Sequence, residues 1–133
     1  MNISKPRCFL VYALAPPELQ PSEANRAFND YIADPVRGLV LYHDHFIGTP
    51  GGMAIFFVEN YDQRNALAAL DSLPGWRIEV KPLIFAYNPA AFDEQIGYTL
   101  QAYRQADWET LKQEKRPSYG DPQQEAETAR EEQ

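Results

Sequence analysis

The sequence predicts an α+β fold, in which strands and helices follow one another in the order β-α-β-β-α-β before a third helix and a polar tail. Three observations predict this class. The chain has 133 residues, a length that corresponds to one hydrophobic core. Hydrophobic residues make up 44% of it and charged residues 23%, which are values of globular proteins. Apolar runs typical of strands alternate with stretches whose apolar residues recur every three or four positions, as on a helix.

The first three elements are a strand, a helix and a second strand. Residues 8–15 are a continuous apolar run rich in β-forming side chains and are closed by two prolines. A helix then starts at Ser22, a favourable N-cap, and ends at Asp34, because a residue before proline is disfavoured in the α region. Residues 39–47 form the second strand, and the turn-forming residues 49–52 follow it.

The next three elements are a strand, a helix and a fourth strand. Residues 53–58 are apolar at every position, which predicts a strand with two apolar faces. Asn60 and the glutamine three residues later fit a capping box, and Pro74 stops the helix that they begin. Residues 76–81 alternate apolar and polar side chains, as in a half-exposed strand, and residues 83–87 either continue that strand or kink away from it.

A third helix is predicted over residues 91–115, because acidic residues occupy its first turn and basic residues its end. Its apolar stripe is interrupted at Asp107. Residues 117–133 contain almost no side chains that could join a core, so we expect a polar, flexible tail. The predicted domain therefore spans residues 1–116.

This order of elements is that of the ferredoxin-like split βαβ arrangement, in which the first and third strands are central. Two helices cover only one face of a four-stranded antiparallel sheet, yet both central strands carry apolar side chains on both faces. A second apolar face of this size needs a partner. We therefore expect two sheets to stack into a barrel around the axis of a homodimer, or a higher oligomer; the alternative is that the third helix covers the face.

The stretch 52–82 resembles the muconolactone-isomerase-like branch of the dimeric α+β-barrel superfamily. The likeness lies in a strand that ends in Glu59, a leucine-rich helix, the Ser-Leu-Pro stop at 72–74 and the Ile-Glu-Val-Lys-Pro-Leu strand at 78–83. The resemblance implies a dimeric barrel. For activity it implies proton-transfer isomerisation, or a related lyase or monooxygenase reaction, on a small aromatic-derived or lactone-like acid without a cofactor. It carries over no catalytic residue.

His43 and His45 are the main candidates for chemistry. On a strand, residues two apart face the same side, with α-carbons about 6.5–7 Å apart. Three interpretations stay open: ordinary polar residues of an edge strand, an acid–base pair that titrates near neutrality, or two ligands of a transition metal whose third ligand comes from elsewhere. The prediction assigns proton transfer to both histidines and assigns neither a metal site nor a cofactor.

Tyr12, Tyr42 and Arg77 are the candidates for binding a ligand. Each tyrosine lies within an otherwise apolar strand, where its hydroxyl either meets a ligand carbonyl or carboxylate or belongs to a core or interface aromatic. The guanidinium of Arg77 could bind a carboxylate, or it could be part of a solvated strand face.

Charge and motif content exclude several classes of function. The chain carries 12 basic and 19 acidic residues, a net charge of −7, which argues against a nucleic-acid partner. It has no apolar run of membrane-spanning length, no secretory signal and one cysteine, so we expect a cytoplasmic protein without membrane contact or disulfide framework. The phosphate-loop, dinucleotide-binding and Ser-His-Asp patterns are also missing from the sequence.

Three functions remain. The first is an oligomeric barrel that binds a small, mostly apolar molecule, which two-faced apolar strands and the lack of a catalytic signature favour. The second is the cofactor-free enzyme, with His43 or His45 as the base and Tyr12 or Arg77 holding the anion of the substrate. The third is a structural oligomerisation domain whose last helix and acidic tail bind another protein.

Overall fold

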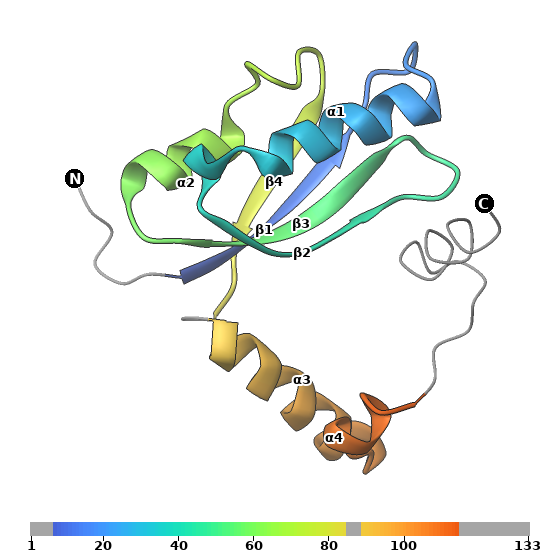
Figure 1. Cartoon of the computed structure of the whole chain (residues 1–133), viewed down its shortest axis with the longest axis vertical. Helices are drawn as coiled ribbons and strands as arrows, with labels where there is room; N and C mark the ends of the chain where they lie inside the picture. The colour runs from blue at the N-terminus through green and yellow to red at the C-terminus, as the bar shows by residue number, and fades with distance from the viewer. Residues whose placement is uncertain (1–6, 85–88, 115–133) are drawn as a thin grey trace, which may run out of the picture. The chain divides into compact units, whose positions relative to one another are not determined.

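The computed structural model describes residues 7–84 and 89–114, which fall into two compact units, Met1–Gln95 and Ile96–Gln133. The first unit is a four-stranded antiparallel sheet with two helices and a short 3-10 turn, η1 (Figure 1). Its elements are β1 (Arg7–Leu14), α1 (Pro21–Ala33), η1 (Pro35–Arg37), β2 (Leu39–His45), β3 (Gly51–Val58), α2 (Tyr61–Ala68) and β4 (Arg77–Pro82). The α+β class is therefore confirmed.

The strands lie in the order β2-β3-β1-β4, so β1 and β3 are central, as the sequence predicts. Helices α1 and α2 both cover one face of this sheet (Figure 1). The main core lies between them and the sheet, and it consists of Phe9, Val11, Ala13, Ala24, Phe28, Tyr31, Ile32, Ala54, Phe56, Val58, Leu67, Leu73 and Trp76. Each fully buried large apolar side chain contributes about 1.5–3 kcal/mol to folding. This core holds α1 against the sheet.

We call the opposite side of the sheet the open face. A smaller cluster around Cys8 and Ile55 lies on it, and Phe92 packs against that cluster. On the open face β1 is only partly buried, since the side chain of Tyr12 is 42% exposed. The two central strands are nevertheless apolar on both sides, because Leu10 and Leu14 accompany Tyr12 on β1 and Met53, Ile55 and Phe57 lie on β3.

Two helix boundaries differ from the prediction. Helix α1 begins one residue before Ser22, which lies in its first turn, and its N-cap is Gln20, whose backbone N–H donates to Glu23 Oε1 at 3.3 Å. For α2 the cap is confirmed, since Asn60 Oδ1 accepts from the backbone N–H of Gln63 at 2.9 Å. That helix ends at Ala68 and not at Pro74, because the chain after it turns to bury other side chains in the core.

The prediction of a single third helix is wrong in one respect, because the structure has two helices in its place. α3 spans Pro89–Arg104 and α4 spans Trp108–Leu111. Between them Gln105 adopts a left-handed conformation with φ of 50°, and Asp107 caps α4 by accepting from the backbone N–H of Thr110 at 3.1 Å. Asp competes for backbone hydrogen bonds and so favours a cap over a helix interior.

Some predicted segments lie outside the described residues, namely 85–88, the last predicted helical residue and the polar tail at 117–133. Among the helices that the structure describes, none has the length and apolar character needed to cross a membrane.

Candidate functional site

A β-bulge in β2 decides which of its side chains face α1. Val40 pairs with Phe56 of β3, and Tyr42 pairs with Ile55, so Leu41 is an extra residue without a partner of its own. Phe56 belongs to the helix-covered core, whereas Ile55 belongs to the cluster on the open face. The alternation of β2 therefore reverses at Leu41.

Because of this reversal, His43 and His45 lie on the helix-covered side and Asp44 lies on the open face. The two imidazole rings are neighbours, with centroids 5.7 Å apart and planes at 86° to each other. The prediction that the two histidines share a face is confirmed. Their face is the one that α1 covers, and β2 is an edge strand, so the pair lies at the edge of the sheet.

His45 packs against α1. Its ring meets the ring of Phe28 edge-on at a centroid distance of 5.9 Å, and its Nε2 lies 3.0 Å from Asn29 Oδ1. Burial, and then the neighbouring His43, lowers the pKa of His45, while Asp44 acts in the opposite direction. The imidazole of His45 is therefore neutral near pH 7, and its Nε2–H donates to the amide oxygen of Asn29.

Two of the predicted ligand-binding residues, Tyr12 and Tyr42, lie on the open face. The ring of Tyr12 packs on Phe46 at a centroid distance of 5.0 Å. The hydroxyl of Tyr42 donates to Asp44 Oδ2 at 3.3 Å. Partial burial, together with the carboxylate of Asp44, raises the pKa of Tyr42, so this phenol stays protonated. Aromatic rings and hydroxyl groups thus share one side of the sheet.

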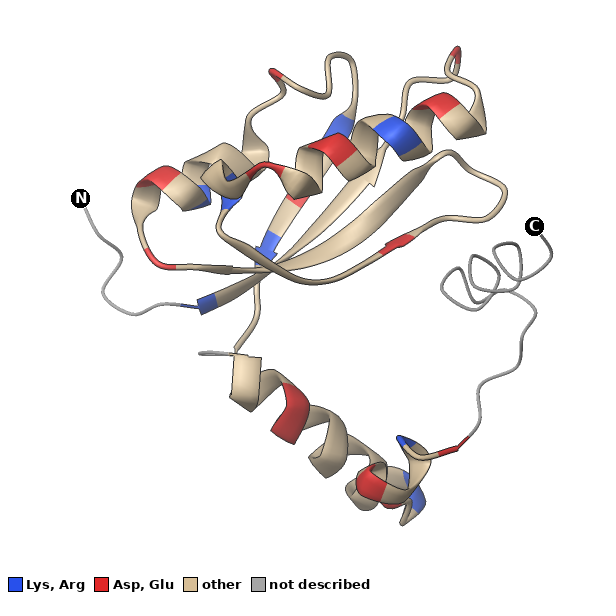
Figure 2. Cartoon of the chain, in the orientation of Figure 1, with Lys and Arg blue, Asp and Glu red and all other residues tan. Residues whose placement is uncertain are grey.

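The third predicted ligand-binding residue, Arg77, also lies on the open face, because it pairs with Leu14 of β1. Along β4, Glu79 and Lys81 follow on the same side, so that basic and acidic groups alternate at this edge (Figure 2). Tyr12 pairs directly with Glu79. The open face therefore has an apolar, aromatic centre bordered by a charged strand.

Within one chain the structure does not bring the histidines together with the predicted anion-binding groups. His43 and His45 lie on the α1 side of the sheet, and Tyr12 and Arg77 lie on the other. A single site that combines them would need atoms to reach through a hydrogen-bonded sheet. The molecule thus offers two separate candidate sites, the histidine pair and the open face.

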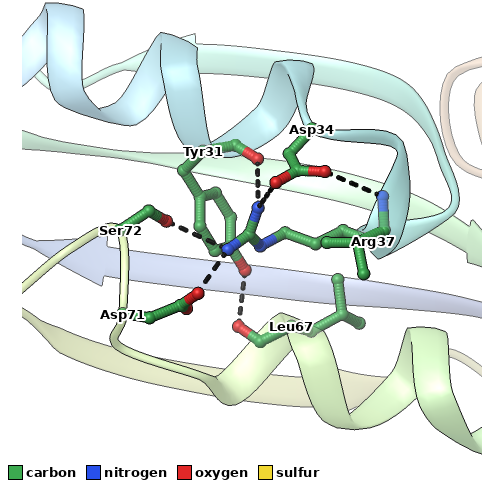
Figure 3. A network of polar contacts seen from close by, with 7 residues as sticks. Tyr31, Asp34, Arg37, Leu67, Asp71 and Ser72 are labelled. Carbon is green, nitrogen blue, oxygen red and sulfur yellow. Dashed lines mark hydrogen bonds and ion pairs between the residues drawn. The ribbon is translucent and has the colours of Figure 1, made fainter.

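One buried charged residue was missed by sequence reasoning. Arg37 is 1% exposed, and its guanidinium lies over the ring of Tyr31 at 4.1 Å (Figure 3). Its Nη1 donates to the backbone oxygen of Tyr31 and its Nη2 to Ser72 Oγ, both at 3.0 Å. Carboxylate oxygens of Asp34 and Asp71 lie 3.6 and 3.7 Å away. This network joins η1 to the segment after α2, and its partners are the protein's own groups, so we assign it to folding.

The same network fixes the tyrosine beneath the guanidinium. The hydroxyl of Tyr31 donates to the backbone oxygen of Leu67 in α2 (Figure 3). Burial raises the pKa of Tyr31 to about 12, although the charge of Arg37 acts in the opposite direction. No signal in the sequence distinguishes Arg37 from an exposed arginine, because its burial depends on residues more than thirty positions away.

Among the residues that the structure describes, no group of three or more His, Cys, Asp or Glu side chains could hold a metal ion. No known protein family, curated protein or solved structure matches the chain. Functional conclusions about this protein therefore rest on the geometry of its two candidate sites.

Proposed function

We propose that this chain is a ferredoxin-like α+β-barrel protein that associates with a second copy through its open face and holds a small, mostly apolar molecule between the two sheets. One observation carries the proposal. Three large side chains on the open face, Tyr12, Leu39 and Tyr42, are 42%, 54% and 49% exposed. Contiguous apolar patches of this kind on a protein surface mark interaction sites.

A second copy is the occupant that fits this face best. Packed sheets lie about 10 Å apart, so two identical apolar faces can interdigitate across a two-fold axis. An axis along the strands sets the β4 edge of one protomer over the β2 edge of the other. In this arrangement Asp44 on β2 would lie opposite Glu79 on β4, which is level with it in the register of the sheet, with Arg77 and Lys81 one step to either side. The strand order β2-β3-β1-β4, with β1 and β3 central, supports the ferredoxin-like part of the proposal.

The start of the third helix, α3, also contacts the open face. Its first turn contributes Phe92 to the cluster around Cys8 and Ile55. Farther along, Trp108 of α4 packs over Gly97 of α3. A methyl group at Gly97 would lie 3.8 Å from Trp108 Cβ. That part of α3 is therefore used to pack α4.

The side chains of the face define the class of ligand. The ring pair Tyr12–Phe46 offers an aromatic surface to a flat apolar group. The guanidinium of Arg77 could bind a carboxylate at the edge of the sheet. The expected ligand is therefore a small molecule with an apolar body and at most one anionic or carbonyl group.

Native mass spectrometry of tag-free protein tests the proposal, because it reports subunit number and retained ligand together. We expect a dimer or larger even assembly that carries additional mass, and we expect Tyr12→Ala to lose that mass. Tyr61→Ala is the matched control, since Tyr61 is an exposed tyrosine at the start of α2. A monomer without added mass, or an equal loss of mass in both variants, would contradict the proposal.

A second candidate function is proton transfer at the histidine pair, in line with the resemblance to muconolactone isomerase. The geometry of the pair favours it, because the exposed ring of His43 lies beside the ring of His45, with centroids 5.7 Å apart, and an imidazole can accept a proton. Turnover of a small lactone or aromatic-derived acid should then fall at least a hundredfold in His45→Ala. Unchanged turnover in His43→Ala and His45→Ala would remove both residues from the mechanism.

A further inference from the structure

We propose that His43, His45 and Asn29 form a binding site for a divalent transition-metal ion of the kind that prefers imidazole ligands, such as Cu²⁺, Ni²⁺ or Zn²⁺. The site lies where the edge strand β2 meets α1, on the side of the sheet opposite the open face. It is therefore independent of the proposed dimer interface, and each can be tested without the other.

The two imidazoles are close enough to share one ion. Bonds from imidazole nitrogen to such metals are about 2.0–2.1 Å long, which sets the ring centroids of two adjacent ligands on one ion about 4.5–5.2 Å apart, a little closer than the two rings are now. The centroids of His43 and His45 are 5.7 Å apart. The strand fixes this spacing, because its alternation holds both side chains on one face. Chelation by the pair therefore needs side-chain rotation and no movement of the backbone.

The third donor comes from the neighbouring helix. Asn29 Oδ1 lies 3.0 Å from His45 Nε2. Two donors at right angles on an ion with bonds near 2.1 Å are about 3.0 Å apart, so Asn29 Oδ1 is close enough to join His45 on one ion once both side chains turn toward it. When Nε2 binds the ion, the ring proton of His45 would move to Nδ1, and the hydrogen bond to Asn29 would give way to the two metal bonds. Sequence spacing alone does not reveal Asn29, because it lies on another element.

The surroundings leave room for the rest of a coordination shell. His43 and Asn29 are exposed, so water can occupy the remaining positions. Two nitrogen donors and one neutral oxygen donor suit borderline metals and not Mg²⁺ or Ca²⁺, which prefer carboxylate oxygens. The donors are neutral. Among Zn²⁺, Ni²⁺ and Cu²⁺, we expect Cu²⁺ to bind most tightly.

The test uses tag-free full-length protein with CuCl₂ for electron paramagnetic resonance and ZnCl₂ for calorimetry. We expect one ion per chain and a spin-echo modulation pattern of two equatorial imidazoles. His43→Ala and His45→Ala should each weaken binding at least about tenfold. Two imidazoles that bind one ion together hold it more tightly than either does alone, so the loss of one removes this advantage. Asn29→Ala should weaken Zn²⁺ binding by a smaller factor, and Asn29→Asp should strengthen it.

The double variant His43→Ala/Asn65→His is the matched control. It keeps two histidines in the chain but moves one to an exposed position of α2, away from β2. We expect it to bind as weakly as His43→Ala alone. Two ions per chain, a pattern of one imidazole, or an affinity that the loss of His43 leaves unchanged would overturn the proposal. Because His43 is exposed, its removal should leave the fold intact, which circular dichroism checks.

Discussion

Arg37 shows how one side chain can hold several segments together. Its guanidinium is buried, which is costly unless the donors are satisfied. The two carboxylates nearby are largely exposed, with side chains 51% exposed for Asp34 and 80% for Asp71, so each ion pair contributes less than about 1 kcal/mol. The hydrogen bonds to Tyr31 and Ser72 and the stacking on Tyr31 therefore offset the desolvation of Nη1 and Nη2, while the buried Nε has no hydrogen-bond partner.

Arg37→Ala should lower the free energy of unfolding by about 2–4 kcal/mol, because it leaves a cavity and an unpaired buried carbonyl. Asp71→Asn should lower it by less than about 1 kcal/mol. Urea denaturation followed by fluorescence measures both. Equal losses in the two variants would mean that the ion pairs, and not the buried bonds, hold the guanidinium.

The raised pKa of Tyr31 makes the free energy of unfolding depend on pH in the alkaline range. Its pKa is raised to about 12 in the folded chain, and an unfolded tyrosine has a pKa near 10. Below pH 10 both states are protonated and nothing changes. Above pH 10 the unfolded state releases its proton first, so stability falls by about 1.4 kcal/mol for each pH unit up to about pH 12.

The check is the pH profile of the urea midpoint in wild type and Tyr31→Phe. The variant lacks the hydroxyl, so it should be less stable at pH 8 by about 1–2 kcal/mol and should lose less stability between pH 10 and 12. Parallel profiles for the two proteins would show that another group controls the alkaline loss.

At the scale of elements, the sequence predicts most of the sheet and not the faces of β2. Apolar runs and turn residues located the four strands, and their order followed from the alternation of elements. The bulge at Leu41 has no such signal, because an apolar residue in an apolar strand fits either face. Without the bulge, the histidines would lie on the open face beside Tyr12, as the predicted enzyme site required.

The break between α3 and α4 shows the opposite case, since the interruption at Asp107 was visible in the sequence. The sequence does not show whether Asp107 stays inside one helix or caps a second one. In the structure it caps α4, because its side chain accepts a hydrogen bond from the backbone N–H of Thr110. The contact of Asn29 with His45 was invisible, because it joins α1 to β2 across sixteen residues.

Substitution of Gly97 and of Gly52 by alanine tests the packing of two elements, because the first should stabilise α3 and the second should destabilise the sheet. A Cβ at Gly97 would meet Trp108 at 3.8 and 3.9 Å, which is ordinary contact, so Gly97→Ala should stabilise α3 by about 0.5–1 kcal/mol. A Cβ at Gly52 would lie 2.6 Å from Asp44 O and 2.8 Å from the ring of Phe28. Gly52→Ala should therefore destabilise the sheet by about 1–3 kcal/mol.

Hydrogen exchange resolved by residue measures both effects, because it reports α3 and the sheet separately. Protection in α3 should rise in Gly97→Ala, and protection in β2 and β3 should fall in Gly52→Ala. A loss of protection in α3 on substitution of Gly97 would contradict the packing of Trp108 described above.

At the scale of the whole molecule, the central claim is that a second copy covers the open face. α1 and α2 cover one side of the sheet, while three large apolar or aromatic side chains stay between 42% and 54% exposed on the other. A face of this kind favours association, since the gain is about 25 cal/mol for each Å² of apolar surface removed from water. The apolar runs in the sequence predicted the two-faced strands, and the structure shows which of their side chains remain exposed.

The most direct measurement is sedimentation velocity on wild type, Leu39→Lys and Leu70→Lys at about 50 µM. Leu39 is 54% exposed on the open face, and Leu70, 44% exposed after α2, is the matched control. We predict that wild type and Leu70→Lys sediment as dimers or larger assemblies and that Leu39→Lys sediments as a folded monomer. A monomeric wild type, or a Leu39→Lys variant that associates as well as wild type, would contradict the account.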